Sequence, residues 1–228
     1  MNKTIVYIDG YNLYYSRLRG GVYKWLDIVA LFDAILKVQD VTSELIQVKY
    51  FTSPIKASFA SHGAASDAAQ TQYHRALQAR HPNRLGIIKG FHIFEPSHLP
   101  IYEEGRPADK TKRVRVWGIE EKQTDVNMAL EVYRDAVQGR CTQVIICSND
   151  SDLEPAMRLI REDAPEIKVG LVLPLKRNSA KSTRISNKRL THLADWVRSH
   201  ILDEELANAQ LPVMVATNRK PAHKPLHC

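Results

Sequence analysis

The sequence predicts an α/β domain built on a mainly parallel sheet. Apolar runs of strand length alternate along the chain with segments of helical period, which is the pattern of βαβ units. A length of 228 residues suits one such domain with a short appendage. An apolar share of 44% is enough to bury a sizeable core, which argues against a disordered or fibrous chain.

The expected elements follow from these alternating patterns. Apolar runs predict strands at 3–8, 45–51, 85–93, 113–117, 143–147 and 167–173. Helical periodicity predicts helices at 26–38, 67–81, 124–138, 154–162 and 187–201. The segments 53–66 and 95–111 read as loops that rim a cleft. Because the apolar period fades after residue 202, we expect the main domain over 1–202, and a helix extension with a flexible C-terminal tail over 203–228.

For two of the helices, the sequence predicts both the N-cap residue and the buried face. Asp27 is the expected N-cap of the helix at 26–38 and Thr124 that of the helix at 124–138. The apolar face of the first helix comprises Ile28, Val29, Leu31, Phe32, Ile35 and Leu36. The expected buried stripe of the second comprises Val126, Ala129, Leu130, Tyr133, Ala136 and Val137.

Charge and cysteine usage narrow the class of protein. The formal net charge of +7 suits a polyanionic partner, and nucleic acid is favoured over membrane because the basic residues do not follow a long amphipathic helix. Three cysteines without C-x-x-C spacing argue against a disulfide framework or a zinc knuckle, and Cys147 reads as a small buried hydrophobe. Asp9 interrupts the first apolar run, so no signal peptide is expected, and the chain reads as cytoplasmic.

Acidic side chains gather where apolar strands are expected to end. Asp9 follows the first strand, Asp150 and Asp152 follow the strand at 143–147, and Asp125 lies in the first turn of the helix at 124–138. Parallel sheets place functional groups at the carboxyl ends of their strands, near the topological switch point. Carboxylates gathered there repel one another unless a cation joins them, and Mg²⁺ prefers oxygen ligands. The pattern therefore predicts an acidic metal site and phosphodiester chemistry.

Three ordered motifs carry a resemblance to a known family. The segments 7–12 (YIDGYN), 122–131 (KQTDVNMALE) and 148–155 (SNDSDLEP) resemble those of the NYN domain, in the LabA-like branch of the PIN-like nucleases. The resemblance covers roughly residues 1–200. It implies a Rossmann-like three-layer α/β/α sandwich with a central, mainly parallel sheet, and a divalent-metal-dependent ribonuclease.

The resemblance also implies roles for individual residues. Asp9, Asp125, Asp150 and Asp152 match the acidic motif positions, and Asn12 matches the asparagine that accompanies the first. The chain departs from the common pattern at three positions, with Asn149 for a usual glycine, Glu131 for a frequent aspartate and Leu153 for a common aromatic residue. Asn149 tolerates the left-handed conformation that glycine supplies, so the turn is expected to survive.

The expected activity is an endoribonuclease that uses Mg²⁺ or Mn²⁺. Asp9 and Asp150 are the first choices for direct metal ligands, Asp125 and Asp152 complete the site directly or through water, and Asn12 orients Asp9 or the scissile phosphate. Residues expected to contact the RNA share a basic or hydroxyl side chain near the motifs or in the basic stretch 176–189. They are Lys122, Ser148, Lys176, Arg177, Lys181 and Arg184.

Other functions remain open from the sequence alone. One is a catalytically weak RNA-binding regulatory module of the same fold, for which Asn149 is the one hint; another is a DNA or flap nuclease. Phosphatase chemistry of the haloacid dehalogenase type is disfavoured, because Tyr11 occupies the position where a second aspartate is needed. Tyr11, Tyr14 and Tyr15 offer base stacking beside the site, although core packing with the hydroxyl at the rim is favoured for at least two of them.

Overall fold

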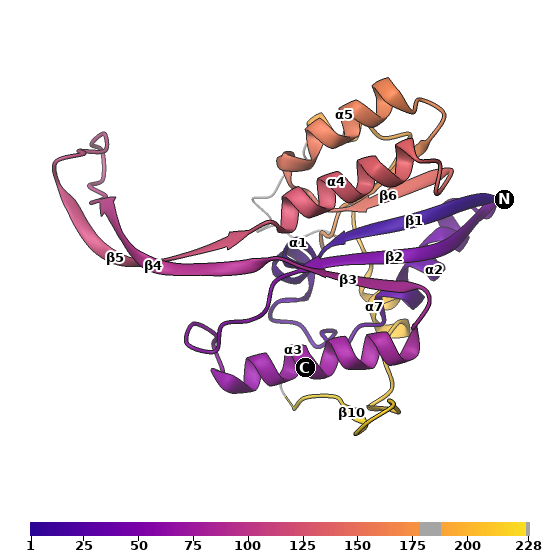
Figure 1. Ribbon diagram of the computed structural model, residues 1–228, viewed down its shortest axis with the longest axis horizontal. Helices are drawn as coiled ribbons and strands as arrows, with labels where there is room; N and C mark the ends of the chain where they lie inside the picture. Colours follow the sequence, from indigo (N-terminus) through magenta and orange to yellow (C-terminus); the bar gives the residue numbers. More distant parts are fainter. Residues whose placement is uncertain (178–187, 227–228) are drawn as a thin grey trace.

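A six-stranded parallel sheet forms the centre of the computed structural model, which describes residues 1–177 and 188–226 (Figure 1). The strand order is β3-β2-β1-β6-β7-β8, and every neighbouring pair is parallel. The strands are β1 (Asn2–Asp9), β2 (Ser43–Thr52), β3 (Leu85–Lys89), β6 (Gln143–Cys147), β7 (Lys168–Val172) and β8 (Trp196–Arg198). This confirms the predicted α/β class.

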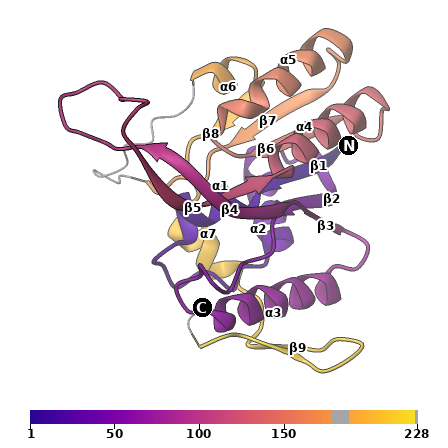
Figure 2. The ribbon, with the colours of Figure 1, turned by 60° about the vertical axis from the view of Figure 1, so that its left-hand side comes forward.

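Helices cover both faces of this sheet, which makes three layers (Figures 1 and 2). One layer contains α2 (Ile28–Gln39), α3 (Ala64–Arg80) and α7 (Asp203–Asn208). The other contains α4 (Thr124–Val137), α5 (Glu154–Asp163) and α6 (Lys188–His192). Strand β1 alternates between two apolar cores, because Val6 and Ile8 pack towards α2 while Ile5 and Tyr7 pack towards α4.

Helix α2 forms as the sequence predicts. Asp27 accepts a hydrogen bond from the backbone N–H of Ala30 at 3.0 Å, which caps the helix. All of the apolar residues assigned to its inner face are buried.

Helix α4 differs from the prediction in its cap and in its buried face. Gln123, with φ 75°, precedes the helix, and the Thr124 hydroxyl donates to the Glu121 carboxylate instead of capping. The buried positions are Thr124, Met128, Val132, Asp135 and Ala136. The predicted stripe was therefore correct at Ala136, and Ala129 and Tyr133 are half-buried against the core, but its other positions were wrong. Val126, Leu130 and Val137 are exposed. The helix is turned because Asp135, a charged residue, faces Lys49 of β2 inside the molecule.

The segment predicted as one strand at 85–93 divides at Gly90. Strand β3 ends at Lys89, and β4 (Phe91–Pro100) leaves the sheet and pairs with β5 (Arg113–Lys122) in an antiparallel ribbon. A Cβ atom at Gly90 would collide with Glu121 and with the backbone of Lys122, so only glycine allows this crossing. The predicted strand 113–117 therefore lies outside the main sheet, and residues 95–100 of the predicted loop 95–111 are strand.

The predicted helix at 187–201 was wrong beyond its first turn. Residues 188–192 are helical, but Trp196–Arg198 form β8, the sixth strand of the sheet. Trp196 lies against Gly170 of β7, where any side chain would collide with the indole ring, and its Nε1 donates to Gln143 Oε1 at 3.1 Å. These contacts with distant residues decide the local structure.

Residues 203–223 pack on the domain. Helix α7 contacts α2, and the short pair β9 (Met214–Val215) and β10 (Ala222–His223) lies along α3. Trp25 Nε1 donates to the carbonyl of Pro212 at 2.8 Å, and Ala222 is buried. Among the helices that the structure describes, none combines the length and apolar character that crossing a bilayer would require.

Candidate functional site

The acidic residues meet where the strand order changes direction. Strand β1 runs between β2, reached next in the chain, and β6, reached last of the three. Ile8 pairs with Cys147 across β1 and β6, so Asp9 and the loop that carries Asp150 leave the sheet side by side. This is the switch point at which open parallel sheets bind ligands.

Asp9 is buried and held by two donors. Its Oδ1 accepts from the Asn12 backbone N–H at 2.9 Å, and its Oδ2 accepts from the Ser148 hydroxyl at 2.9 Å. Burial raises the pKa of Asp9; the hydrogen bonds from Asn12 and Ser148 oppose this, and the charge of Asp150 raises it further. A Cβ atom at Gly10 would lie 2.6 Å from the carbonyl oxygen of Phe51, so this turn requires glycine.

The loop after β6 is held to the first motif by Ser148 and Asn12. Ser148 accepts from the Asp150 backbone N–H at 3.1 Å while donating to Asp9. The Asn149 backbone N–H donates to Asn12 Oδ1 at 3.3 Å. Because Ser148 is fully buried, it positions the two aspartates and does not lie on a substrate surface, contrary to our expectation. Asn12 does hold Asp9, though through its backbone N–H.

Asp150 caps the short turn η2 (Ser151–Leu153) that precedes α5. Its Oδ1 accepts from the backbone N–H of Asp152 at 3.1 Å. The carboxyl group is half-buried, whereas Asp152 is exposed. The second aspartate of this motif therefore lies at the outer side of the cluster.

Asp125 shows how closely the acids are grouped. Burial raises its pKa to about 6, and the charges of Asp9, Asp150, Glu121 and Asp152 raise it as well. Glu121 was missed by the sequence reasoning, because it lies at the end of β5 and matches no motif position. It accepts from Ser53 Oγ at 2.7 Å.

Asp125→Asn is expected to stabilise the metal-free protein at pH 7.5 and to leave its stability unchanged at pH 3.5. The pKa of Asp125 is about 6 in the folded protein, above its ordinary value of 3.8. Protonation of Asp125 therefore stabilises the fold fully below pH 3.8, and this stabilisation is lost as the pH rises through 6. At pH 7.5 the free energy of unfolding is expected to rise by about 1 kcal/mol, after allowance for the solvent screening of a half-buried group. Urea unfolding in EDTA at both pH values measures it. A gain of the same size at both pH values would contradict the electrostatic origin.

Two of the predicted basic contacts pair with acids outside the cluster. The Lys122 ammonium contacts the Glu120 carboxylate, and Lys176 Nζ lies 3.5 Å from Asp203 Oδ2. Arg177 is exposed, and Lys181 and Arg184 lie outside the described residues. Glu131, matched to a motif position, contacts Lys49 Nζ at 2.6 Å and takes no part in the acidic cluster.

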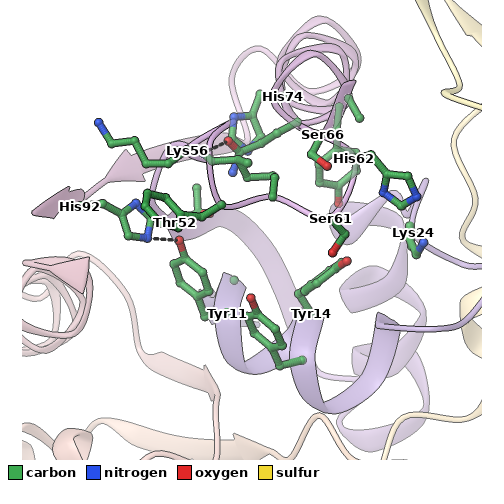
Figure 3. Close-up of a pocket in the computed structure, with 18 of the residues that line it drawn as sticks. Tyr11, Tyr14, Lys24, Thr52, Lys56, Ser61, His62, Ser66, His74 and His92 are labelled. Carbon is green, nitrogen blue, oxygen red and sulfur yellow. Dashed lines mark hydrogen bonds between the residues drawn. The ribbon is translucent and has the colours of Figure 1, made fainter. Parts of the chain in front are cut away.

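A cavity of about 330 Å³ opens beside the first motif (Figure 3). The aromatic side chains in its wall are Tyr11, Tyr14, Tyr15, Tyr50, Phe59 and Tyr73. Ile55, Lys56 and residues 59–62 of the loop also line it, which confirms the predicted role of the segment 53–66 as a rim. The three tyrosines of the first motif and its following turn thus border a cavity; Tyr14 and Tyr15 are exposed, so the favoured core packing was wrong for both.

Two histidines give this cavity polar groups. Tyr11 Oη lies 3.0 Å from His92 Nε2, the contact drawn in Figure 3. Burial, followed by the charge of Lys89, lowers the pKa of His74 to about 4, so its ring is neutral at pH 7. His74 Nε2 is buried without a hydrogen-bond partner in the described structure.

Comparison with known proteins agrees with the motifs. The family model of the NYN domain matches residues 3–193. The chain is 38% identical, over 98% of its length and 74% of the relative's, to 6-hydroxy-3-succinoylpyridine 3-monooxygenase HspA of Pseudomonas putida. A solved protein of unknown function from Vibrio parahaemolyticus shares the fold with a TM-score of 0.50 and 17% identity, over 86% of this chain and 91% of that one. By the extent of the family match, this chain belongs to the NYN domain family.

Proposed function

We propose that this protein is a divalent-metal-dependent nuclease, an endoribonuclease of the LabA-like branch of its family. One observation carries the proposal: Asp9 ends β1, and Asp150 follows the adjacent strand β6, at the switch point. There the charges of both, together with those of Glu121 and Asp152, act on Asp125. Such grouping is unfavourable without a cation. Membership of the NYN family supports nucleic acid as the partner.

The donors present fit a hard cation. Asp9 and Asp150 would hold Mg²⁺ or Mn²⁺ directly, and Asp125 and Asp152 would complete the site directly or through water. Asn12 and Ser148 keep the loops carrying Asp9 and Asp150 in place. Among the described residues, no three potential ligands are already arranged to hold an ion by themselves. Mg²⁺ keeps several waters and takes only one or two carboxylates, so this arrangement suits it. When bound, the ion would activate a water and neutralise charge on the phosphate oxygens.

Metal removal tests the activity. Labelled single-stranded RNA and DNA of the same sequence are incubated with the protein in Mg²⁺, Mn²⁺ or EDTA. We expect the RNA to be cut internally with either metal and to stay intact in EDTA, because the carboxylates alone cannot activate the water. RNA that is bound but not cut in all three conditions would select the regulatory module. Cleavage of the DNA at an equal or higher rate would select the DNA nuclease.

A second candidate function is oxygenation of a pyridine-type acid in the aromatic cavity. The HspA relative, similar over nearly the whole chain, is named for that chemistry. The cavity has aromatic side chains that could pack against a pyridine ring, and Lys56 on its lining could bind the acid group. In such a reaction one atom of O₂ would enter the ring at the carbon that carries the succinoyl group, and the bond to that group would break. With the group leaving as an aldehyde and the other oxygen atom as water, four electrons from two reduced nicotinamide nucleotides balance the step. Oxygen uptake that needs both the nucleotide and 6-hydroxy-3-succinoylpyridine, with RNA left intact, would select this function.

A further inference from the structure

The ribbon of β4 and β5 projects from the body of the molecule (Figures 1 and 2). Its residues pair in register from Phe91 with Lys122 to Pro100 with Arg113. Since side chains alternate along a strand, even-numbered residues of β4 and odd-numbered residues of β5 share one face, which we call the aromatic face. The remaining residues form the opposite face.

Stacked rings follow the aromatic face outwards from the cavity. His92 and Ile119, at its inner end, line the cavity beside Tyr11. Further out, the ring of Phe94 lies 4.1 Å from that of Phe59 and stacks on Trp117, with centroids 4.5 Å apart and an interplanar angle of 17°. Trp117 is 65% exposed although it is the largest side chain of the ribbon. The rings thus lead from the first motif to a solvent-facing indole.

Charge is sorted between the two faces of the ribbon. Arg113 and Arg115 lie on the aromatic face, opposite Pro100 and His98. Glu95 and Glu120 lie on the other face, where Lys122 at the inner end contacts Glu120. The acid on the aromatic face, Glu121, is at the inner end and belongs to the acidic cluster. The outer half of the aromatic face therefore combines exposed rings with positive charge.

We propose that the aromatic face of the β4–β5 ribbon binds single-stranded nucleic acid and leads it to the acidic cluster. A base stacks on the exposed indole of Trp117, which Phe94 supports from behind, and phosphates lie against Arg113 and Arg115. A single strand fits because its unstacked bases offer ring faces, which a duplex hides. A two-stranded ribbon with exposed apolar residues also gains stability from such a cover. The choice of partner rests on the proposed nuclease function.

Binding in EDTA separates this proposal from the nuclease activity. The fluorescence anisotropy of a labelled single-stranded RNA is titrated with wild type and with Trp117→Ala. We expect about tenfold weaker binding for the variant, the loss of one base stack. Leu99→Ala, which removes an exposed apolar side chain from the opposite face, is the matched control and is expected to bind as wild type. Circular dichroism checks that both variants fold.

The salt dependence of binding tests the basic part of the face. Arg115→Gln is expected to reduce the slope of log Kd against log salt concentration by about one, because one phosphate contact is lost. Lys37→Gln on α2 makes the same charge change on an exposed residue of the main domain and is expected to keep the slope. RNA binding in EDTA with no cleavage in Mn²⁺ would refute the nuclease function but leave this proposal standing.

Two results would overturn the proposal. One is equal affinity of Trp117→Ala and wild type for the RNA. The other is a dimer that Trp117→Ala turns into a monomer without a change in RNA affinity, measured by sedimentation. That result would make the aromatic face an interface between two copies of this chain.

Discussion

Asp150→Asn is expected to lower metal-dependent cleavage of RNA by about a thousandfold or more, since even the loss of a group that only supports a metal ligand costs 10–100-fold. Asparagine keeps the shape of the side chain and still accepts the hydrogen bond from the Asp152 backbone N–H, so the cap of the turn survives. It removes the negative charge that a cation needs. Single-turnover cleavage of labelled RNA in Mn²⁺ measures the effect.

The control is an acid-to-amide change at the other end of the sheet. Glu166→Gln lies on an exposed loop just before β7, at the amino ends of the strands, and is expected to cut as wild type. Asp150→Asn is also expected to unfold at the same or a slightly higher urea concentration, because one like charge leaves the cluster. Persistent cleavage by Asp150→Asn would mean that the site lies elsewhere or that the activity belongs to a contaminant. Loss of folding would mean that the carboxylate is structural.

The central sheet and the grouping of the acids could be predicted because their signals are local. Strand β1 is an unbroken apolar run that ends at Asp9, and β6 is another that ends shortly before Asp150. A parallel arrangement alone then brings both carboxyl ends to one edge. The cap of α2 likewise depends on Asp27 and the three residues that follow it.

What could not be predicted depends on residues distant in the sequence. Strand β8 forms where a helical pattern continues, because Trp196 finds Gly170 and Gln143 on neighbouring strands. The cavity brings Tyr11 together with residues of α3 and of the ribbon. Hydrophobic periodicity along the sequence cannot predict contacts between such distant segments. The ribbon could not be predicted because β4 contains prolines at 96 and 100, which normally argue against a strand. A pair of strands outside the main sheet tolerates them.

The buried charges on α4 are the sharpest case of this kind. Asp135 is completely buried, and its carboxylate contacts the Lys49 ammonium. Its Oδ2 also accepts a hydrogen bond from the Tyr7 hydroxyl at 2.7 Å, and its Oδ1 lies 3.0 Å from Arg140 Nη1. Lys49 comes from the middle of β2 and is itself buried. A helical period counts Asp135 as a surface residue, since its partner is invisible in the local sequence.

Lys49→Met is therefore expected to lower the free energy of unfolding by about 3 kcal/mol, the cost of leaving a buried carboxylate without its partner. Methionine fills a similar volume, so little of the loss comes from a cavity. Lys168→Met is the matched control: Lys168 Nζ contacts Asp40 at 2.8 Å, but this lysine is 39% exposed, and its loss should cost at most about 1 kcal/mol. Urea unfolding at pH 7 compares the two. Equal losses would mean that burial does not distinguish these two ion pairs. They would also mean that Arg140 alone suffices to hold Asp135. Arg140 would then keep the inner face of α4 in place, and this face positions Asp125 at the site.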